Sequence, residues 1–360
     1  MKVVYSSFDG RFSDSPRALY ESMRHSRRSL EHVWLRNPLH AAGFPAEVAT
    51  VPATGPEAVE ALESADLVIA NTHIEVDWRK QPGTVYLQTW HGTPLKRVHH
   101  DVFWAPPGRL ARLDADVARW DYLVSPNAAS TPRLRGAFRF PGQVLETGYP
   151  RNDILSSPGA DEVRAAVRAS LGIAPDTVAV LYAPTWRDDE YFDPEGAERG
   201  PGLDFDAFED RFGSSHCVLL RLHPMMTDRV ARVHRPGVRD LSGHPDPHEL
   251  YLAADVLITD YSSVMFDFAV TGKPMLFYAY DLERYRDSLR GFYFDFTPVA
   301  PGPVLPTSAD VIEHLQDLPG VRRSYADRYA EFRRTFCHLE DGHAADRLDW
   351  LTERTAARPR

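Results

Sequence analysis

Short apolar runs that end in polar turns recur along this chain and alternate with segments of helical pattern. The first such runs are 2–5 (KVVY), 65–72 (ADLVIANT), 83–90 (GTVYLQTW) and 121–127 (DYLVSPN). A helical pattern, 16–25 (PRALYESMRH), lies between the first two. Near-continuous apolar strands separated by helices are typical of a parallel sheet that helices cover on both faces. The alternation therefore predicts an α/β fold.

The pattern breaks at 146–173 and then starts again. A turn-rich stretch (SSPGAD) leads there into a strong helix (DEVRAAVRASLG), and a second alternating set follows at 178–187, 217–224, 248–263 and 264–280. Two such sets predict two Rossmann-like domains facing a cleft, as in glycosyltransferase-B architecture. We expect domains at 1–155 and 156–340 and a C-terminal helix at 341–360, with 308–355 helical throughout.

Composition narrows the classes of function. The net charge is −10 and the pI is near 5.8, so nucleic acid is not an expected partner. The two cysteines, Cys217 and Cys337, have no metal-ligand spacing and no disulfide framework, which fits a reducing compartment. The first residues lack signal-peptide character, and no apolar stretch approaches the roughly 20 residues that span a bilayer. We expect a cytoplasmic protein.

The residues at the ends of the predicted strands are the candidates for binding and catalysis. Ligands of open α/β sheets bind outside the carboxyl ends of the strands, and His91 stands at such an end, after the run 83–90. Gly92 lets the backbone approach a ligand, and Thr93 offers a hydroxyl group. A neutral imidazole is the usual general base for a hydroxyl nucleophile. We favour this function for His91 over that of a hydrogen-bonded histidine in the core.

Basic and imidazole groups follow two strands of the second set. His223 stands after a predicted strand and before a proline, where it either caps the next helix or donates hydrogen bonds to a phosphate. Arg187 and Arg221 are candidate phosphate ligands, because a guanidinium group forks onto phosphate oxygens. Arg221 alternates with apolar residues, so a buried structural pair is an equal alternative.

The stretch 257–278 (LITDYSSVMFDFAVTGKPMLFY) predicts a further anion site. An apolar run ends at Asp260, and Ser262 and Ser263 stand where a helix begins. Serine hydroxyls and free N–H groups at a helix N-terminus bind phosphate, and the same groups also cap the helix. Upstream, His248 and Glu249 either contact a nucleobase or ribose or are solvated residues at a helix start.

Several familiar motifs are missing from the sequence. No acidic pair, HExxH or Cys/His set predicts a metal site, so we expect no metal and no cofactor. Neither GxGxxG nor GxxxxGK[ST] occurs, which argues against a dehydrogenase or a P-loop NTPase.

Several ordered motifs together resemble one known family. TWHGTPLK, DYLVSPN, GYPRNDIL, LYAPTWRDD, RLHP and ITDYSSVMFDFAVTGKPMLFYAYDLERY are similar to motifs of the CDP-glycerol glycerophosphotransferase family, the teichoic-acid and capsule polyol-phosphate transferases. The resemblance spans roughly residues 80 to 350. It implies a glycosyltransferase-B fold, an acceptor-side N-terminal domain and a CDP-donor-binding C-terminal domain.

The resemblance also implies a metal-independent transfer of a polyol phosphate from a CDP-activated donor, with release of CMP. His91 and His223 would be the catalytic histidines, with His91 as the base for the acceptor hydroxyl. The residues implied to bind the donor are Gly92, Thr93, Arg187, Arg221, His248, Glu249, Asp260, Ser262 and Ser263. The implied acceptor is a cell-wall or capsule glycan or its polyprenyl-linked precursor.

Other functions stay open at this point. Glycerol and ribitol both fit the donor, single addition and polymerisation both fit the reaction, and the sequence does not set the oligomeric state. A nucleotide-sugar glycosyltransferase on the same scaffold and a non-catalytic assembly module are the rival classes. Phe103 and Trp104 stand beside arginines in 102–124, which suits peripheral contact with the inner face of the membrane as well as a plain surface helix.

Overall fold

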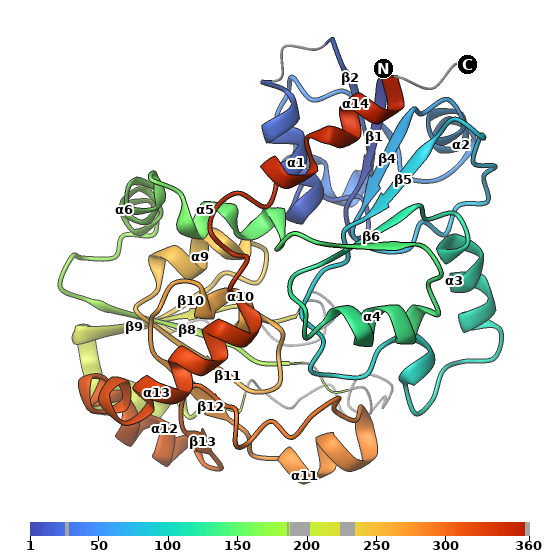
Figure 1. Ribbon diagram of the computed structural model, residues 1–360. Coiled ribbons are helices and arrows are strands. Elements are labelled where there is room, and N and C mark those ends of the chain that lie inside the picture. The colour runs from blue at the N-terminus through green and yellow to red at the C-terminus, as the bar shows by residue number, and fades with distance from the viewer. Residues whose placement is uncertain (26–28, 186, 188–201, 224–234, 357–360) are drawn as a thin grey trace. The chain divides into compact units, whose positions relative to one another are not determined.

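The computed structural model describes residues 1–25, 29–185, 187, 202–223 and 235–356 (Figure 1). Trp186, within the predicted segment 178–187, and Pro224, at the end of the predicted segment 217–224, lie outside these residues. The chain divides into two compact units. Unit 1 comprises 1–93, 98–156 and 338–360, and unit 2 comprises 94–97 and 157–337.

Unit 1 is built on a parallel sheet, which within the described residues has the strand order β3-β2-β1-β4-β5-β6-β7. The strands are β1 (Lys2–Ser6), β2 (Glu31–Arg36), β3 (Thr50–Pro52), β4 (Leu67–Ala70), β5 (Val85–Gln88), β6 (Tyr122–Ser125) and β7 (Gln143–Glu146). β1 pairs in parallel with β2 on one side and β4 on the other, so the strand order reverses between β1 and β4. Ligands of such sheets bind at this reversal.

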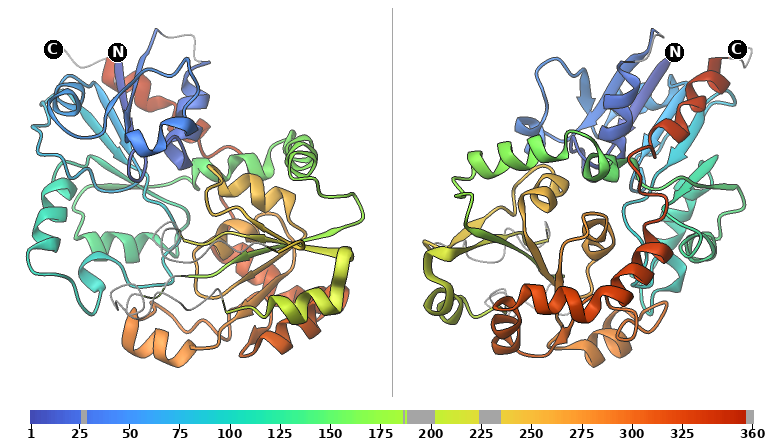
Figure 2. Two further views of the ribbon diagram at one scale, coloured as in Figure 1. Left: turned by 180° about the vertical axis from the view of Figure 1, so that it is seen from behind. Right: turned by 60° about the vertical axis from the view of Figure 1, so that its left-hand side comes forward.

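Helices cover both faces of the unit 1 sheet, which explains why its strands are apolar throughout. They are α1 (Asp14–Met23), α2 (Pro56–Glu63), α3 (Arg109–Val117), α4 (Thr131–Phe138), α5 (Asp153–Ser156) and α14 (Trp350–Ala356), with short 3-10 turns η1 (Pro38–Gly43), η2 (His99–Asp101), η3 (Pro150–Asn152) and η8 (Asp346–Leu348). α1 and α14 lie against one face, and α2 lies against the other (Figures 1 and 2). Leu19 and Leu351 belong to the first core layer, and Leu62 belongs to the second.

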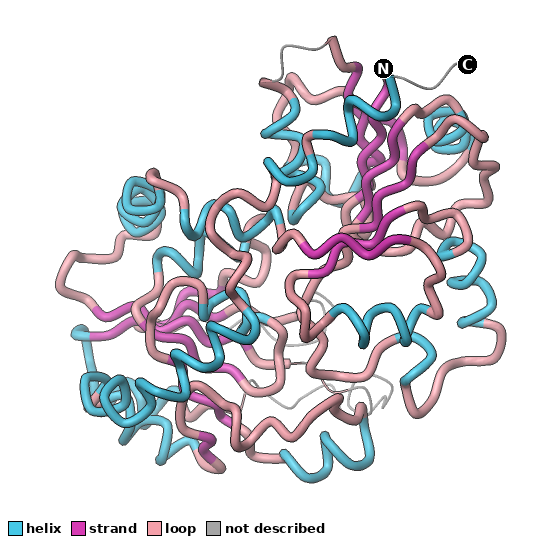
Figure 3. The backbone as a smooth tube through the Cα atoms, viewed as in Figure 1, coloured by secondary structure: helices cyan, strands magenta, loops and turns pink. Residues whose placement is uncertain are grey.

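Unit 2 contains a second parallel sheet, which is the second group of magenta strands in Figure 3. Its strand order among the described residues is β10-β9-β8-β11-β12-β13. The strands are β8 (Val178–Ala183), β9 (His216–Leu220), β10 (Val238–Asp240), β11 (Val256–Thr259), β12 (Met275–Tyr278) and β13 (Val304–Leu305). β8 pairs with both β9 and β11, so this order also reverses, between β8 and β11. Each unit therefore has a sheet edge of the kind at which α/β proteins bind ligands.

The helices of unit 2 include one long C-terminal element. They are α6 (Ala160–Ser170), α8 (Phe205–Phe212), α9 (Pro247–Ala253), α10 (Val264–Ala269), α11 (Leu282–Arg284), α12 (Ser308–Leu315) and α13 (Leu318–Phe336), with the 3-10 turn η5 (Gly213–Ser215) and a π-helical turn η7 (Tyr285–Leu289). Phe208, Val311 and Val321 bring α8, α12 and α13 into one core with the strands.

The expectation of one helical segment over 308–355 is wrong. Helix α13 ends at Phe336, and the chain reaches α14 only through the turn η8. The intervening segment packs in unit 1, where the Glu340 carboxylate accepts a hydrogen bond from the Tyr149 N–H at 3.1 Å. Gly148 has φ +79, and a Cβ there would lie 2.7 Å from the Leu339 carbonyl oxygen. Only glycine permits this close return of the chain.

Candidate active site

His91 lies at the carboxyl edge of the unit 1 sheet, after β5, and the adjacent strand fixes its tautomer. The carbonyl oxygen of Asn71, which follows β4, lies 2.6 Å from His91 Nδ1. A carbonyl only accepts hydrogen bonds, so Nδ1 carries the proton and Nε2 keeps its lone pair in the neutral ring. No other described residue makes a hydrogen bond with this ring. Nε2 is therefore the atom that can accept a proton.

The surroundings keep His91 neutral. Burial lowers the pKa of His91, and the Asn71 carbonyl and the charge of Asp14 only partly oppose this shift. Phe8 and Trp90 contact the imidazole, with ring centroids 5.5 and 4.0 Å from its own. An uncharged imidazole at neutral pH is the form that a general base needs.

A buried ion pair supports this edge. Arg151 Nη1 lies 2.7 Å from Asp14 Oδ2, and both side chains are 5% exposed. Burial alone would raise the pKa of Asp14, but Arg151 and the backbone N–H of Ser15 outweigh it, so the pKa lies below its usual value. Asp14 thus stays charged, and its charge raises the pKa of His91.

Three residues around the same sheet edge have strained backbone conformations. Phe8, Asp14 and Trp90 have φ values of +48, +62 and +56, in the left-handed region that these residues rarely adopt. Such conformations persist where the surrounding structure imposes them, most often at functional sites. The residue directly before His91 is one of the three.

Sequence patterns alone did not identify Asp14, Asn71 or Arg151. Asn71 ends an apolar run and Arg151 lies in the GYPRNDIL motif, but neither carries a local sign of its partner. Asp14 and Arg151 are 137 positions apart, and only the fold brings them together. Gly92 and Thr93, which were predicted, are both buried beside His91.

In unit 2, the structure brings two predicted residues into direct contact. Arg187 Nη1 lies 2.9 Å from Asp260 Oδ2, and Arg187 forms a two-pronged pair with Asp281 at 2.8 Å for both bonds. Asp260 also accepts hydrogen bonds from the backbone N–H groups of Thr185 and Tyr261. Burial opposes the charge of Arg187, but the two carboxylates outweigh it and raise its pKa. This guanidinium group is held inside the protein.

Arg221 and His223 follow β9 at the same sheet edge. Arg221 Nη1 donates to the carbonyl oxygens of His244 at 2.8 Å and Leu241 at 3.3 Å, which gives it a structural partner in the neighbouring loop. The His223 side chain, two residues later, is exposed. Of the two, His223 is the one whose side chain faces solvent.

Ser262 and Ser263 form the turn between β11 and α10. Both are partly exposed, and Ser262 Oγ lies 3.5 Å from the Val264 N–H. The Ser263 side chain makes no capping hydrogen bond. The turn therefore presents polar groups at the reversal between β8 and β11, and its role as an anion site stays a prediction.

His248 and Glu249 open α9. The His248 ring is buried, with Nδ1 3.0 Å from Asp246 Oδ1, and Glu249 pairs with His244 at 3.5 Å. His248 is thus packed into the helix start, and Glu249 is half-buried.

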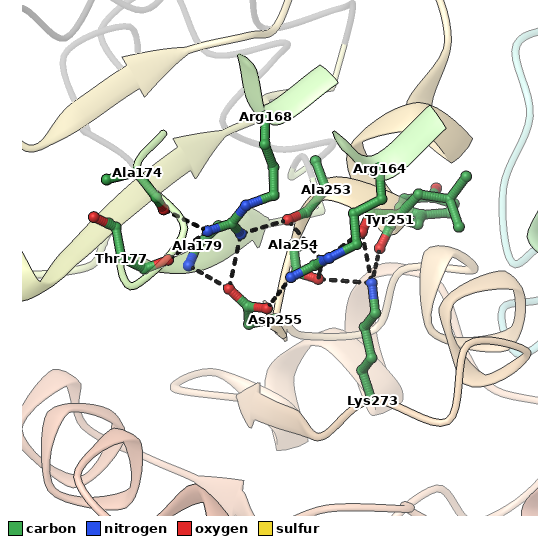
Figure 4. Close-up of polar contacts among 11 residues, drawn as sticks. Arg164, Arg168, Ala174, Thr177, Ala179, Tyr251, Ala253, Ala254, Asp255 and Lys273 are labelled. Carbon is green, nitrogen blue, oxygen red and sulfur yellow. Dashed lines mark hydrogen bonds and ion pairs between the residues drawn. The ribbon is translucent and has the colours of Figure 1, made fainter. Parts of the chain in front are cut away.

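A cationic cluster holds the other end of α9 (Figure 4). Lys273 Nζ donates to the carbonyl oxygens of Tyr251, Leu252 and Ala254 at 2.7–2.9 Å. Burial and the neighbouring Arg164 lower the pKa of Lys273 to about 7. Cations at a helix C-terminus satisfy carbonyls that have no partner within the helix.

Asp255 balances this cluster. It pairs with Arg164 at 2.5 Å and with Arg168 at 3.0 Å, both from α6. It also accepts the backbone N–H of Ala179 at 2.8 Å, at the start of β8. The sequence did not predict these ion pairs and hydrogen bonds, which connect α6, α9 and the sheet.

The meeting of His91 and His223 over one donor stays a prediction.

Known proteins resemble the whole chain. The family model described as CDP-Glycerol:Poly(glycerophosphate) glycerophosphotransferase matches residues 1–351. The chain is 36% identical over 355 residues to the teichoic acid poly(glycerol phosphate) polymerase of Bacillus subtilis (strain 168), covering 96% of this chain and 48% of that protein. It is also 36% identical over 370 residues to the teichoic acid glycerol-phosphate transferase of Staphylococcus aureus (strain NCTC 8325 / PS 47), covering 96% and 91%. The chain thus spans about half of the first relative and most of the second.

A solved structure has the same fold. A variant of the wall teichoic acid polymerase TagF superposes with a TM-score of 0.90 at 32% identity, covering 99% of this chain and 89% of that chain. The prediction of two Rossmann-like domains of the glycosyltransferase-B type is confirmed. Among the residues that the structure describes, no helix is long and apolar enough to cross a bilayer.

Proposed function

Because the chain belongs to the CDP-glycerol:poly(glycerophosphate) glycerophosphotransferase family, we propose that it transfers glycerol phosphate from CDP-glycerol to a hydroxyl group of a wall polymer. The observation that carries this proposal is the His91 site. There a neutral imidazole presents Nε2 at a sheet edge, with its tautomer held by Asn71. Relatives named as glycerol-phosphate transferases and polymerases, and a TagF structure soaked with CDPG, support this donor.

In the proposed reaction, His91 Nε2 takes the proton of the acceptor hydroxyl. The acceptor oxygen forms a bond to the β-phosphorus, the bond from that phosphorus to the bridging oxygen breaks, and CMP leaves with the electron pair. Phosphoryl transfer of this kind depends on positioning and on stabilisation of charge. His223 and the turn of Ser262 and Ser263 would hold the diphosphate, because their polar groups are partly or fully exposed at the unit 2 edge.

The remaining predicted donor residues take supporting places in this proposal. Arg187 and Asp260 would hold the loop after β8 through their buried pair. Arg221 would hold the loop 241–244, and His248 and Glu249 would shape the start of α9. Gly92 and Thr93 would form the floor next to His91.

The test is a donor panel read out by CMP or UDP release. Purified chain is incubated with CDP-glycerol, CDP-ribitol and UDP-sugars in the presence of a wall-polymer acceptor. CMP release from CDP-glycerol supports the proposal. CMP release from CDP-ribitol alone would mean that the transferred polyol is ribitol. UDP release would mean that the chain is a nucleotide-sugar glycosyltransferase. No release from any donor would favour an assembly module.

Substitution of His91 tests the assignment of the base. His91→Ala should reduce CMP release by about 10²–10⁴-fold, the usual contribution of a general base. His25→Ala is the matched control, because His25 is an exposed histidine in the same unit. Equal turnover of His91→Ala and the control would remove His91 from the chemistry.

A membrane contact is a further part of the proposal. Phe103 and Trp104 are 55% and 69% exposed at the start of the loop 102–108, and α3 follows with Arg109 and Arg112. Glu75 pairs with both arginines, at 2.6 and 3.2 Å, so the aromatic rings would supply most of the affinity. A lipid-linked acceptor would then be reached from the bilayer surface.

A further inference from the structure

Two adjacent histidines and an aspartate converge in unit 1 and have no part in the proposed transfer step. His99 and His100 belong to the turn η2, and Asp114 lies on α3. His100 Nε2 lies 2.8 Å from Asp114 Oδ1, and His99 Nε2 lies 3.8 Å from the same oxygen. One ligand atom from each residue lies within 4.8 Å of the other two.

His99 is buried without a proper hydrogen bond. Its side chain is 1% exposed, and neither ring nitrogen makes a well-formed hydrogen bond with any described residue. Leaving a buried polar group without a hydrogen-bond partner is unfavourable. The backbone at His99 is also in the left-handed region, with φ +50. The ring nitrogens of His99 therefore have room for a partner that the described protein groups do not supply.

The orientation of His99 suits a metal ligand. Its Nε2 faces the same Asp114 oxygen that His100 Nε2 contacts.

The spacing and chemistry of the three groups favour an ion of the zinc class. Ligands at about 2.0–2.1 Å from a tetrahedral ion lie about 3.3 Å apart. The two distances to Asp114 Oδ1, 2.8 and 3.8 Å, lie on either side of this value, and the ligand atoms all lie within 4.8 Å of one another. Imidazole nitrogens suit zinc and its neighbours, whereas magnesium and calcium prefer oxygen ligands. The Asp114 side chain is 43% exposed, so water can reach a fourth position.

We propose that His99, His100 and Asp114 bind one divalent transition-metal ion of the zinc class. The ligands flank the loop 102–108, so the ion would join both ends of that loop and hold η2 to α3. Closing a loop in this way restricts its conformations. The ion has no place in the transfer step proposed at His91. No metal-binding sequence motif covers the site, because two ligands are adjacent and the third lies on a separate helix.

Zinc titration of the full, untagged chain tests this site. After dialysis against chelator, isothermal titration with Zn²⁺ should show one site per chain, and Co²⁺ should give the visible absorption of a bound ion. Asp114→Asn and His100→Gln should each weaken binding by about 10-fold or more. Both side chains are at least partly exposed, and circular dichroism confirms that the variants are folded.

Matched controls separate this site from chance surface binding. His343 and Asp346 form an exposed histidine–aspartate pair at 2.8 Å in the same unit, so His343→Gln and Asp346→Asn should leave zinc binding unchanged. The proposal is overturned if the wild type binds no zinc, or binds it no more tightly than Asp114→Asn and His100→Gln. Equal loss in the controls would overturn it as well.

Chelator distinguishes this site from the proposed chemistry. It should lower the melting temperature of the zinc-loaded wild type and leave that of His100→Gln unchanged. CMP release by His100→Gln in chelator then reports the transfer step alone. If His100→Gln releases no CMP in chelator, the proposal of a metal-free transfer reaction fails. The zinc titration still tests the metal site, because it does not depend on CMP release.

Discussion

Replacing Arg187 by methionine tests whether this residue supports the fold or binds the donor. Arg187 donates four hydrogen bonds, two to Asp281, one to Asp260 and one to the Thr185 carbonyl. Its side chain and those of the two aspartates are 1%, 3% and 9% exposed. Arg187→Met would keep much of the apolar volume but leave two buried carboxylates without their cation.

The expected loss of stability is large. Removing one partner of a buried, hydrogen-bonded ion pair costs about 3–5 kcal/mol, mainly because the remaining charge stays buried. With a slope of about 3 kcal/mol per M urea, the unfolding midpoint should fall by roughly 1–1.7 M. Neutralising both carboxylates in the Arg187→Met background should recover part of this loss, since the unpaired charges are then removed.

Urea unfolding followed by circular dichroism measures the effect, with Arg334→Met as the control. Arg334 pairs with Glu331 on the exposed face of α13, where an ion pair contributes about 0.5 kcal/mol. If Arg187→Met unfolds at the same urea concentration as this control but shows a raised KM for CDP-glycerol, the argument from burial fails. Arg187 would then be a ligand of the donor phosphates.

Two further predictions concern unit 1. The negative charge of Asp14 raises the pKa of His91, so Asp14→Asn should lower that pKa and move the acidic limb of the kcat/KM–pH profile to lower pH, because the base then stays unprotonated further into acid. Asp9→Asn, at an exposed position, should not move the limb, and a limb that stays fixed or moves upward in Asp14→Asn would contradict a basic His91. For the membrane contact, Phe103→Ser/Trp104→Ser should lose most co-sedimentation with anionic lipid vesicles, whereas Leu39→Ser, at an 85% exposed position, should retain it. Equal binding by the aromatic variant and the wild type would show that this loop does not touch the bilayer.

Local patterns were enough to place the elements and the first candidate residues. Apolar runs predicted strands such as β4, β6 and β11, and the polar residues after them predicted which side chains stand at the sheet edges. His91, Ser262 and Ser263 were found in this way. The long helical segment predicted for 308–355 was wrong because helical pattern does not report where a chain turns back to join another core.

Pairing over long sequence distances needed the tertiary structure. Asp14 meets Arg151, Arg187 meets Asp281, and Lys273 meets the end of α9 only because the strand order brings these segments together. The sequence determined the two parallel α/β sheets and the polar groups at their edges. Both depend on residues that are close together in the chain: apolar runs form buried strands, and the residues directly after them carry the polar side chains. The tertiary structure decided which of those groups are bound to one another inside the protein and which still face solvent, because that depends on neighbours that the sequence places far apart.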